Sequence, residues 1–234
     1  MLEAGLWGLF AASSLLIGAL LSFTGWIKPR ALRMVTAFGS GVLISAIAYD
    51  LVEEAVNVSA TGISVAVGFV LGSLVFYAGD TLTDRWASSG SSQGLGILLG
   101  AVLDGIPESV VLGASLLAGG GVSVAVLVAI FISNVPEGLA SSSGLAKGGR
   151  SRTSIVLIWV AVVVVSGIAA AIGYGALRGA SGDAVAVIDA FAAGAILTML
   201  ADEMIPSAFV AGDKLPGVAT AAGFAFAALL SFSA

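Results

Sequence analysis

The chain has 234 residues, of which 59% are hydrophobic and only 10% are charged, and its mean hydropathy is +1.11. Because about a quarter of the residues in a typical soluble domain are charged, this composition excludes an ordinary soluble protein. Nine Lys and Arg against 14 Asp and Glu leave no basic surface for a nucleic-acid partner. The sequence has no Cys and no His, which excludes disulfide scaffolds, His-dependent catalysis and His-ligated zinc. The composition therefore indicates a membrane protein, and we expect it to have neither a prosthetic group nor enzymatic activity.

Eight stretches are long and apolar enough to cross the membrane as helices, each of which needs about 20 residues. They leave only short connections, so we expect residues 1–234 to form one all-α transmembrane transport domain in the cytoplasmic membrane. The first stretch follows Met1-Leu2-Glu3 and is too long for a signal peptide, so we expect it to be retained. The expected spans are Ala4–Ile27, Met34–Val52, Ala55–Gly79, Gly94–Ala118, Val122–Ala146, Thr153–Leu177, Ala184–Ile205 and Leu215–Ser233.

The basic residues predict the orientation of these spans. Only Arg178 lies between spans six and seven. The other eight basic residues lie between spans one and two, three and four, five and six, or seven and eight. Since Lys and Arg are enriched in cytoplasmic loops, we expect these four connections in the cytoplasm and both termini outside.

Two sequence likenesses within the chain predict inverted repeats. Leu103-Asp-Gly-Ile-Pro-Glu-Ser109 in the fourth span matches Ile132-Ser-Asn-Val-Pro-Glu-Gly138 in the fifth without a gap. A fainter likeness joins residues 41–50 in the second span to residues 194–203 in the seventh. Each pair runs in opposite directions through the bilayer, which is a recurring plan in transporters. For the second pair, a chance likeness between Ala, Leu and Gly runs is an equally good explanation.

The fourth and fifth spans carry acids near mid-depth. A charged side chain there costs about 2.5–3.5 kcal/mol, so Asp104, Glu108 and Glu137 together would cost on the order of 8–10 kcal/mol. No Lys or Arg lies in the core of any expected span, so these acids are either protonated or hold an ion. Asp104 and Glu108 are four residues apart, as are Ser133 and Glu137, while Asn134 and Glu137 are three apart, so each set shares a helix face.

A proline precedes the glutamate in each of the two motifs. Pro107 and Pro136 remove the hydrogen bonds to the carbonyls of Leu103 and Ile132, four residues back, so we expect both spans to be broken at the site. Carboxylate, amide, hydroxyl and carbonyl oxygens from the two helices would then face one another. An all-oxygen cluster of this kind suits a divalent cation.

Further acids lie toward both ends of the expected path. Asp50 and Glu53 end the second span, and Asp202 and Glu203 lie toward the end of the seventh. We expect these four residues to line the transport pathway, where acids raise the local cation concentration. For Glu53, and for Glu54, Asp80 and Asp84, simple solvation at a helix end is an equally good explanation.

The two motifs resemble those of the ZIP (Zrt/Irt-like protein) family of divalent-metal transporters, particularly its prokaryotic members. The family has eight spans, both termini outside and typically His-Asn-x-Pro-Glu-Gly in its fourth span. The resemblance implies metal ligands at Glu108, Asn134 and Glu137, with Asp104 in place of the first histidine and Ser133 at the matching fifth-span position. Gly105 replaces the asparagine, and the sixth span has no acid, so a second bridged metal is not expected. Losing imidazole leaves hard oxygen donors, which favours manganese or ferrous iron over zinc.

We therefore expect a transporter whose substrate is a divalent metal: Mn²⁺, Fe²⁺ or Zn²⁺. Two alternatives stay open. The same acids would titrate in a carrier of protons or of a small cation, and a relative without transport activity would use them for metal sensing or assembly. The expected partners are the lipid bilayer and the metal ion, and the small-residue helix faces permit a homodimer without requiring one.

Overall fold

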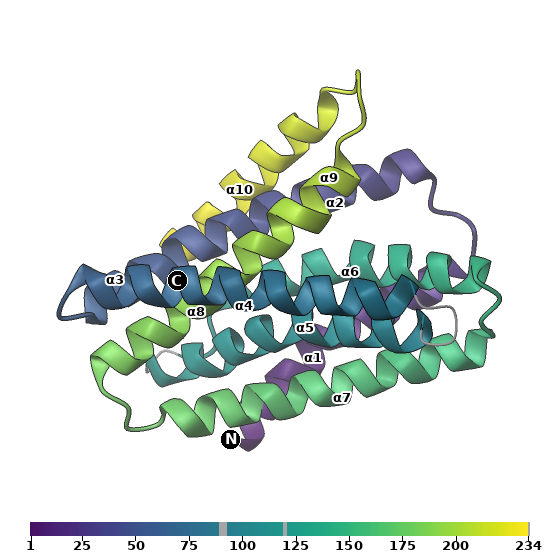
Figure 1. The fold of residues 1–234 in the computed structure, drawn as a ribbon. Coiled ribbons are helices and arrows are strands. Elements are labelled where there is room, and N and C mark those ends of the chain that lie inside the picture. The colour runs from purple at the N-terminus through teal and green to yellow at the C-terminus, as the bar shows by residue number, and fades with distance from the viewer. Residues whose placement is uncertain (89–92, 119–120, 234) are drawn as a thin grey trace.

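The computed structural model describes residues 1–88, 93–118 and 121–233, and every regular element in those ranges is a helix (Figure 1). Two of the helices, α2 and α8, each run into a π-helical segment and then a short further helix. The elements are α1 (Leu2–Ser22), α2 (Pro29–Ala46), η1 (Ile47–Val52), α3 (Glu53–Val58), α4 (Gly62–Ser88), α5 (Gln93–Ser115), η2 (Leu116–Ala118), α6 (Val124–Lys147), α7 (Arg152–Leu177), α8 (Gly182–Met199), η3 (Leu200–Met204), α9 (Ile205–Ala208) and α10 (Leu215–Ser233).

Seven helical segments in the described part of the chain are long and apolar enough to cross a membrane. The fourth expected span corresponds to α5, which is not among those seven. Many large apolar side chains on these helices are exposed, including Leu157, Ile168 and Ile172 on α7. Apolar surface of this kind on long helices suits contact with lipid. The chain is thus a multi-pass helical membrane protein.

Several expected span boundaries differ from the structure. The second span continues through η1 and α3 to Val58, and the third begins at Gly62 rather than at Ala55. Glu53 and Glu54 are good helix formers, so they extend the helix, which ends only where Ser59 becomes extended. The third span continues to Ser88, past its expected end at Gly79. Residues 89–92, between the expected third and fourth spans, and Gly119 and Gly120, between the fourth and fifth, lie outside the described residues.

The bundle has two ends, which we name by the chain connections that lie there. The terminal face holds the start of α1, the end of α10 and the connections over 59–61 and 178–181. The opposite face holds the connections over 23–28, 148–151 and 209–214 (Figure 1). Of the nine basic residues, only Arg178 lies at the terminal face.

The helices form two groups of four, α1 with α5, α6 and α7, and α2 with α4, α8 and α10. Each group contains two tightly crossed helix pairs, and a glycine from each helix lies at every crossing. The contact is reciprocal: each glycine meets the backbone of the partner helix at the residue three positions before the partner's own glycine. The two backbones are therefore in direct contact. The paired glycines are Gly18 with Gly138, Gly113 with Gly173, Gly41 with Gly223, and Gly72 with Gly194.

The crossings reveal an internal symmetry that supports the fainter sequence likeness. Phe38 and Gly41 of α2 correspond to Phe191 and Gly194 of α8, each 153 positions later in the chain. The first residues of η1 and η3 are also 153 positions apart. A shift of 151 likewise converts Gly72 of α4 into Gly223 of α10. The α2·α10 and α8·α4 pairs therefore share the spacing of their crossing glycines.

The π-helical segments interrupt α2 and α8, whereas α5 and α6 continue through their prolines. Pro107 and Pro136 both lie inside regular helix. The prediction that the helices break at these prolines is therefore wrong. Each proline removes one backbone N–H donor, but the helix continues through it. The π segments are the true irregularities, and such segments are frequent at functional sites.

Candidate functional site

The motifs on α5 and α6 place polar side chains deep in the protein. Asp104 and Glu108 are 7% and 2% exposed, Ser133 and Asn134 are 1% and 3% exposed, and Glu137 is half-buried. One oxygen of Asp104 (Oδ1) and one of Glu108 (Oε1) are buried without any hydrogen-bond partner. The Ser133 hydroxyl instead donates a hydrogen bond to the carbonyl of Ile130 at 3.0 Å, so it does not donate to either carboxylate. Buried polar atoms normally find partners, so the two orphan oxygens require an explanation.

The three acids of the motifs are electrostatic neighbours but do not form a closed cage. Asp104 interacts with Glu137, and Glu108 interacts with both Asp104 and Glu137. Across residues 1–88, 93–118 and 121–233, no group of three or more Asp or Glu side chains is close enough together to hold a metal ion. The structure therefore brings these acids into one neighbourhood, at separations wider than those of a metal-bound site.

A small cavity of about 10 Å³ lies beside Glu108. Asn134 and two serines, Ser109 on α5 and Ser166 on α7, share its lining. A cavity of this size holds about one water molecule. A β-carbon at Gly105 would lie 3.1 Å from the Ser166 hydroxyl oxygen, so the missing side chain at this position leaves room for Ser166.

An open vestibule of about 810 Å³ occupies the terminal face. Its lining comes from the end of the second span, the outer turns of α5 and α6, and the start of α8. Among its described lining residues, four are acidic and none is basic; the four acids are Asp50, Glu53, Glu54 and Asp189. Glu53 is exposed.

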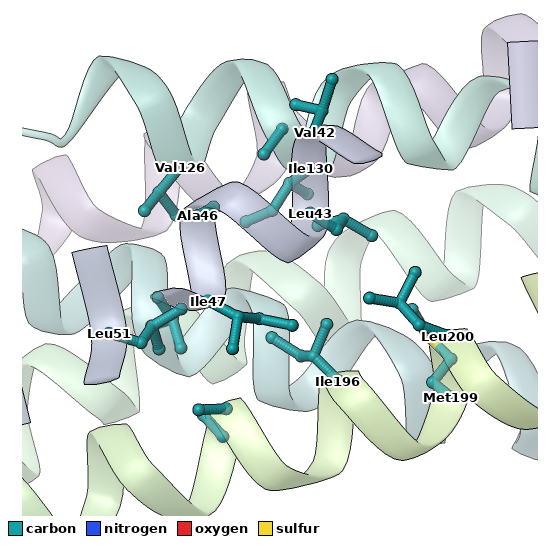
Figure 2. Close-up of a cluster of buried hydrophobic side chains, with 14 of the residues drawn as sticks. Val42, Leu43, Ala46, Ile47, Leu51, Val126, Ile130, Ile196, Met199 and Leu200 are labelled. Carbon is teal, nitrogen blue, oxygen red and sulfur yellow. The ribbon is translucent and has the colours of Figure 1, made fainter. Parts of the chain in front are cut away.

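An apolar plug separates the vestibule from the buried acids. Figure 2 shows Leu43, Ile47 and Leu51 of the second span beside Val126 and Ile130 of α6 and Ile196 of α8. These side chains surround a void of about 10 Å³, which shares Leu51 and Val126 with the vestibule and Ile130 with the cavity at Glu108. A void with no polar partner for a water stays dry. The described residues that line this void are all apolar.

Asp50 ties the two helix groups together above this plug. Its Oδ1 accepts a hydrogen bond from the Ser123 hydroxyl at 2.9 Å, and its Oδ2 accepts one from the Ser231 hydroxyl at 2.8 Å. The Ser123 oxygen also caps α6 by accepting from the Val126 N–H at 3.2 Å. Asp50 therefore links η1 to the start of α6 and the end of α10.

The opposite face carries the symmetry counterpart of this arrangement. By the same offsets in numbering, Asp50 of the second span corresponds to Glu203 of the seventh, and Asp80 of α4 corresponds to Ser231 of α10. Glu203 and Asp202 are both exposed on η3. Glu203 interacts electrostatically with Asp80 and with the buried Asp104, so acids follow one another from the site to this face.

The sequence alone did not predict two residues that line these spaces, one at the vestibule and one at the cavity beside Glu108. Asp189 is only 5% exposed although it lines the vestibule, and an acid about two turns inside α8 was the available signal. Ser166 gave no signal, because serine is common in membrane helices and only the packing of α7 on α5 brings it to Glu108.

The fold and its spans define a helical multi-pass membrane protein with buried acids at its centre. A search against protein-family models finds no match to this chain, and a search of curated protein sequences likewise finds no match.

Proposed function

We propose that the protein transports a divalent metal cation across the cytoplasmic membrane through the buried acids of α5 and α6. Glu108 and Glu137 act as the central ligands, with Asp104, Asn134 and Ser133 completing the oxygen shell. The observation that carries this proposal is the pair of buried, unpartnered carboxylate oxygens on Asp104 and Glu108. Without a compensating cation, such groups would be very costly in the bilayer.

The resemblance of the two Pro-Glu motifs to those of the ZIP family supports the same function. Donor chemistry decides the metal preference: carboxylate, amide and hydroxyl oxygens favour Mn²⁺ or Fe²⁺ over Zn²⁺. Binding of a divalent cation would offset the mutual repulsion of these carboxylates.

The distribution of basic residues supports an outward orientation of the terminal face. On that orientation the vestibule is the outer entrance, and the plug is a closed outer gate. Asp50 and Glu53 lie along the entrance, and Glu203 and Asp202 lie along the inner exit. Rocking of one four-helix group against the other would open one side of the buried acids at a time.

Glu137→Gln tests the ligand role, because the amide keeps the size of the side chain and removes its charge. We expect Mn²⁺ uptake into proteoliposomes to fall to background in this variant while the purified protein remains folded. Glu3→Gln is the matched control, because Glu3 is an exposed residue at the start of α1. Uptake by Glu137→Gln equal to that of the control would refute the ligand role.

The spacing of the acids also favours a second function, a carrier in which the carboxyl groups bind protons rather than a metal. Separated carboxyls that never assemble into a group of three suit titration as well as ligation. Uptake that follows a pH gradient and ignores divalent metals would select this carrier. Metal binding without any flux would select a sensing or assembly role instead.

A further inference from the structure

The vestibule contains one acid whose surroundings differ from those of the other three. Asp189 lines the vestibule from α8 and is only 5% exposed. Within the part of the chain that the structure describes, its carboxylate has no hydrogen-bond or ion-pair partner. Asp50, by contrast, already accepts hydrogen bonds from two serine hydroxyl groups. A buried carboxylate without a partner is costly, so its position beside a water-accessible space suggests a ligand.

Packing of α3 on α8 brings a second carboxylate close to Asp189. Ala55 lies in a small buried cluster with Ala186 and Ala190, the two alanines that flank Asp189 on α8. Glu54 precedes Ala55, is half-buried and interacts electrostatically with Asp189. Small side chains at this contact hold the two helices together, so the two like charges are kept near each other by the fold.

The remaining donors at this position are neutral oxygens. Asn57 lies three residues after Glu54 on α3, on the same helix face, and also lines the vestibule. No Lys or Arg is among the vestibule's described lining residues, so the protein provides no cation of its own there. Two carboxylates, an amide oxygen and water molecules match the oxygen ligands that hard divalent cations take.

We propose that Glu54 and Asp189 form an outer binding site for a partly hydrated divalent cation, separated from the buried acids by the apolar plug. The site captures the ion in the vestibule before the gate opens. The choice of a divalent metal as the ion rests on the proposed function. The existence of a cation site at Asp189 rests only on the unpartnered carboxylate and its neighbour.

The test measures Mn²⁺ binding in a background that lacks the central ligands. The Glu108→Gln/Glu137→Gln protein is placed in lipid nanodiscs and titrated with Mn²⁺ by calorimetry. We expect residual binding, which Asp189→Asn weakens by at least about tenfold, since even outer-shell partners of a metal change affinity that much. Glu54→Gln should weaken it similarly and provides a second test if Asp189→Asn does not fold. Glu3→Gln in the same background is the charge-matched control and should leave the affinity unchanged.

Residual Mn²⁺ binding that neither Asp189→Asn nor Glu54→Gln weakens would overturn the outer site, as would the absence of any residual binding. Failure of the proposed function has a different signature. If the unmodified protein shows no Mn²⁺ uptake but Asp189→Asn still removes the residual binding, transport is refuted and the outer site stands.

Discussion

The glycine crossings predict a large difference between two glycine-to-alanine substitutions in the same protein. A β-carbon at Gly41 would lie 1.9 Å from the carbonyl oxygen of Thr220, whereas side-chain β-carbons essentially never approach closer than 3.0 Å. The difference, 3.0 minus 1.9, means that α2 and α10 must separate by about 1.1 Å locally. The obstacle is backbone, so no change of rotamer can relieve it. Overpacking of this kind costs about 1–3 kcal/mol or more, and α2 would lose its close contact with α10 along the crossing.

Gly144 is the control, because a β-carbon there meets nothing within 4 Å. Gly144→Ala should raise stability by about 0.5–1 kcal/mol, since alanine loses less backbone entropy than glycine in a helix. Thermal unfolding in detergent, followed by tryptophan fluorescence, measures both variants under one condition. We expect a lower midpoint for Gly41→Ala and an equal or higher one for Gly144→Ala. Gly194→Ala should behave like Gly41→Ala, because its β-carbon would lie 2.0 Å from the carbonyl oxygen of Phe69. If Gly41→Ala is as stable as Gly144→Ala, the close backbone contact at this crossing is wrong.

Two further predictions concern the terminal face and the metal preference. Asp50→Ala removes the acceptor of the Ser123 and Ser231 hydroxyls, so the free energy of unfolding should fall by about 1–3 kcal/mol, measured by the same thermal assay; an unchanged midpoint would mean that the two hydrogen bonds contribute nothing. In proteoliposomes, unlabelled Mn²⁺ or Fe²⁺ should inhibit uptake of labelled Mn²⁺ at least as well as Zn²⁺ does, because the expected donors are all oxygen. Clear inhibition by Zn²⁺ at lower concentrations would contradict the donor argument.

Hydropathy was sufficient to predict the helices. A segment that crosses a membrane must form its backbone hydrogen bonds within its own helix, and its side chains must be mostly apolar over a continuous stretch. The boundaries at Val58 and Ser88 were missed for a physical reason. Acidic and polar residues end an apolar pattern without ending a helix, so hydropathy alone placed the second and third spans too short at these points. The π segments were also missed, since no residue type marks them.

The positions of the acids in the sequence predicted their burial but not their distances. Asp104 and Glu108 are buried as their place in the spans indicates. Helical spacing fixes which side chains share a face, whereas the separation between α5 and α6 depends on packing against α1 and α7. The same limit applies to Asp189, whose exposure to the vestibule depends on how α3 packs on α8. Long-range packing, which the sequence pattern does not encode, decides these positions.

The matched positions at the two faces differ in the group that lies beside the acid. Where the terminal face pairs Asp50 with the hydroxyl of Ser231, the other face pairs Glu203 with a second carboxylate, Asp80. A hydroxyl stabilises a carboxylate by donating a hydrogen bond to it, whereas a second carboxylate adds a like charge beside it. The two ends of a nearly symmetric scaffold therefore differ in what lies beside their matched acids, a hydroxyl donor at one end and a second carboxylate at the other.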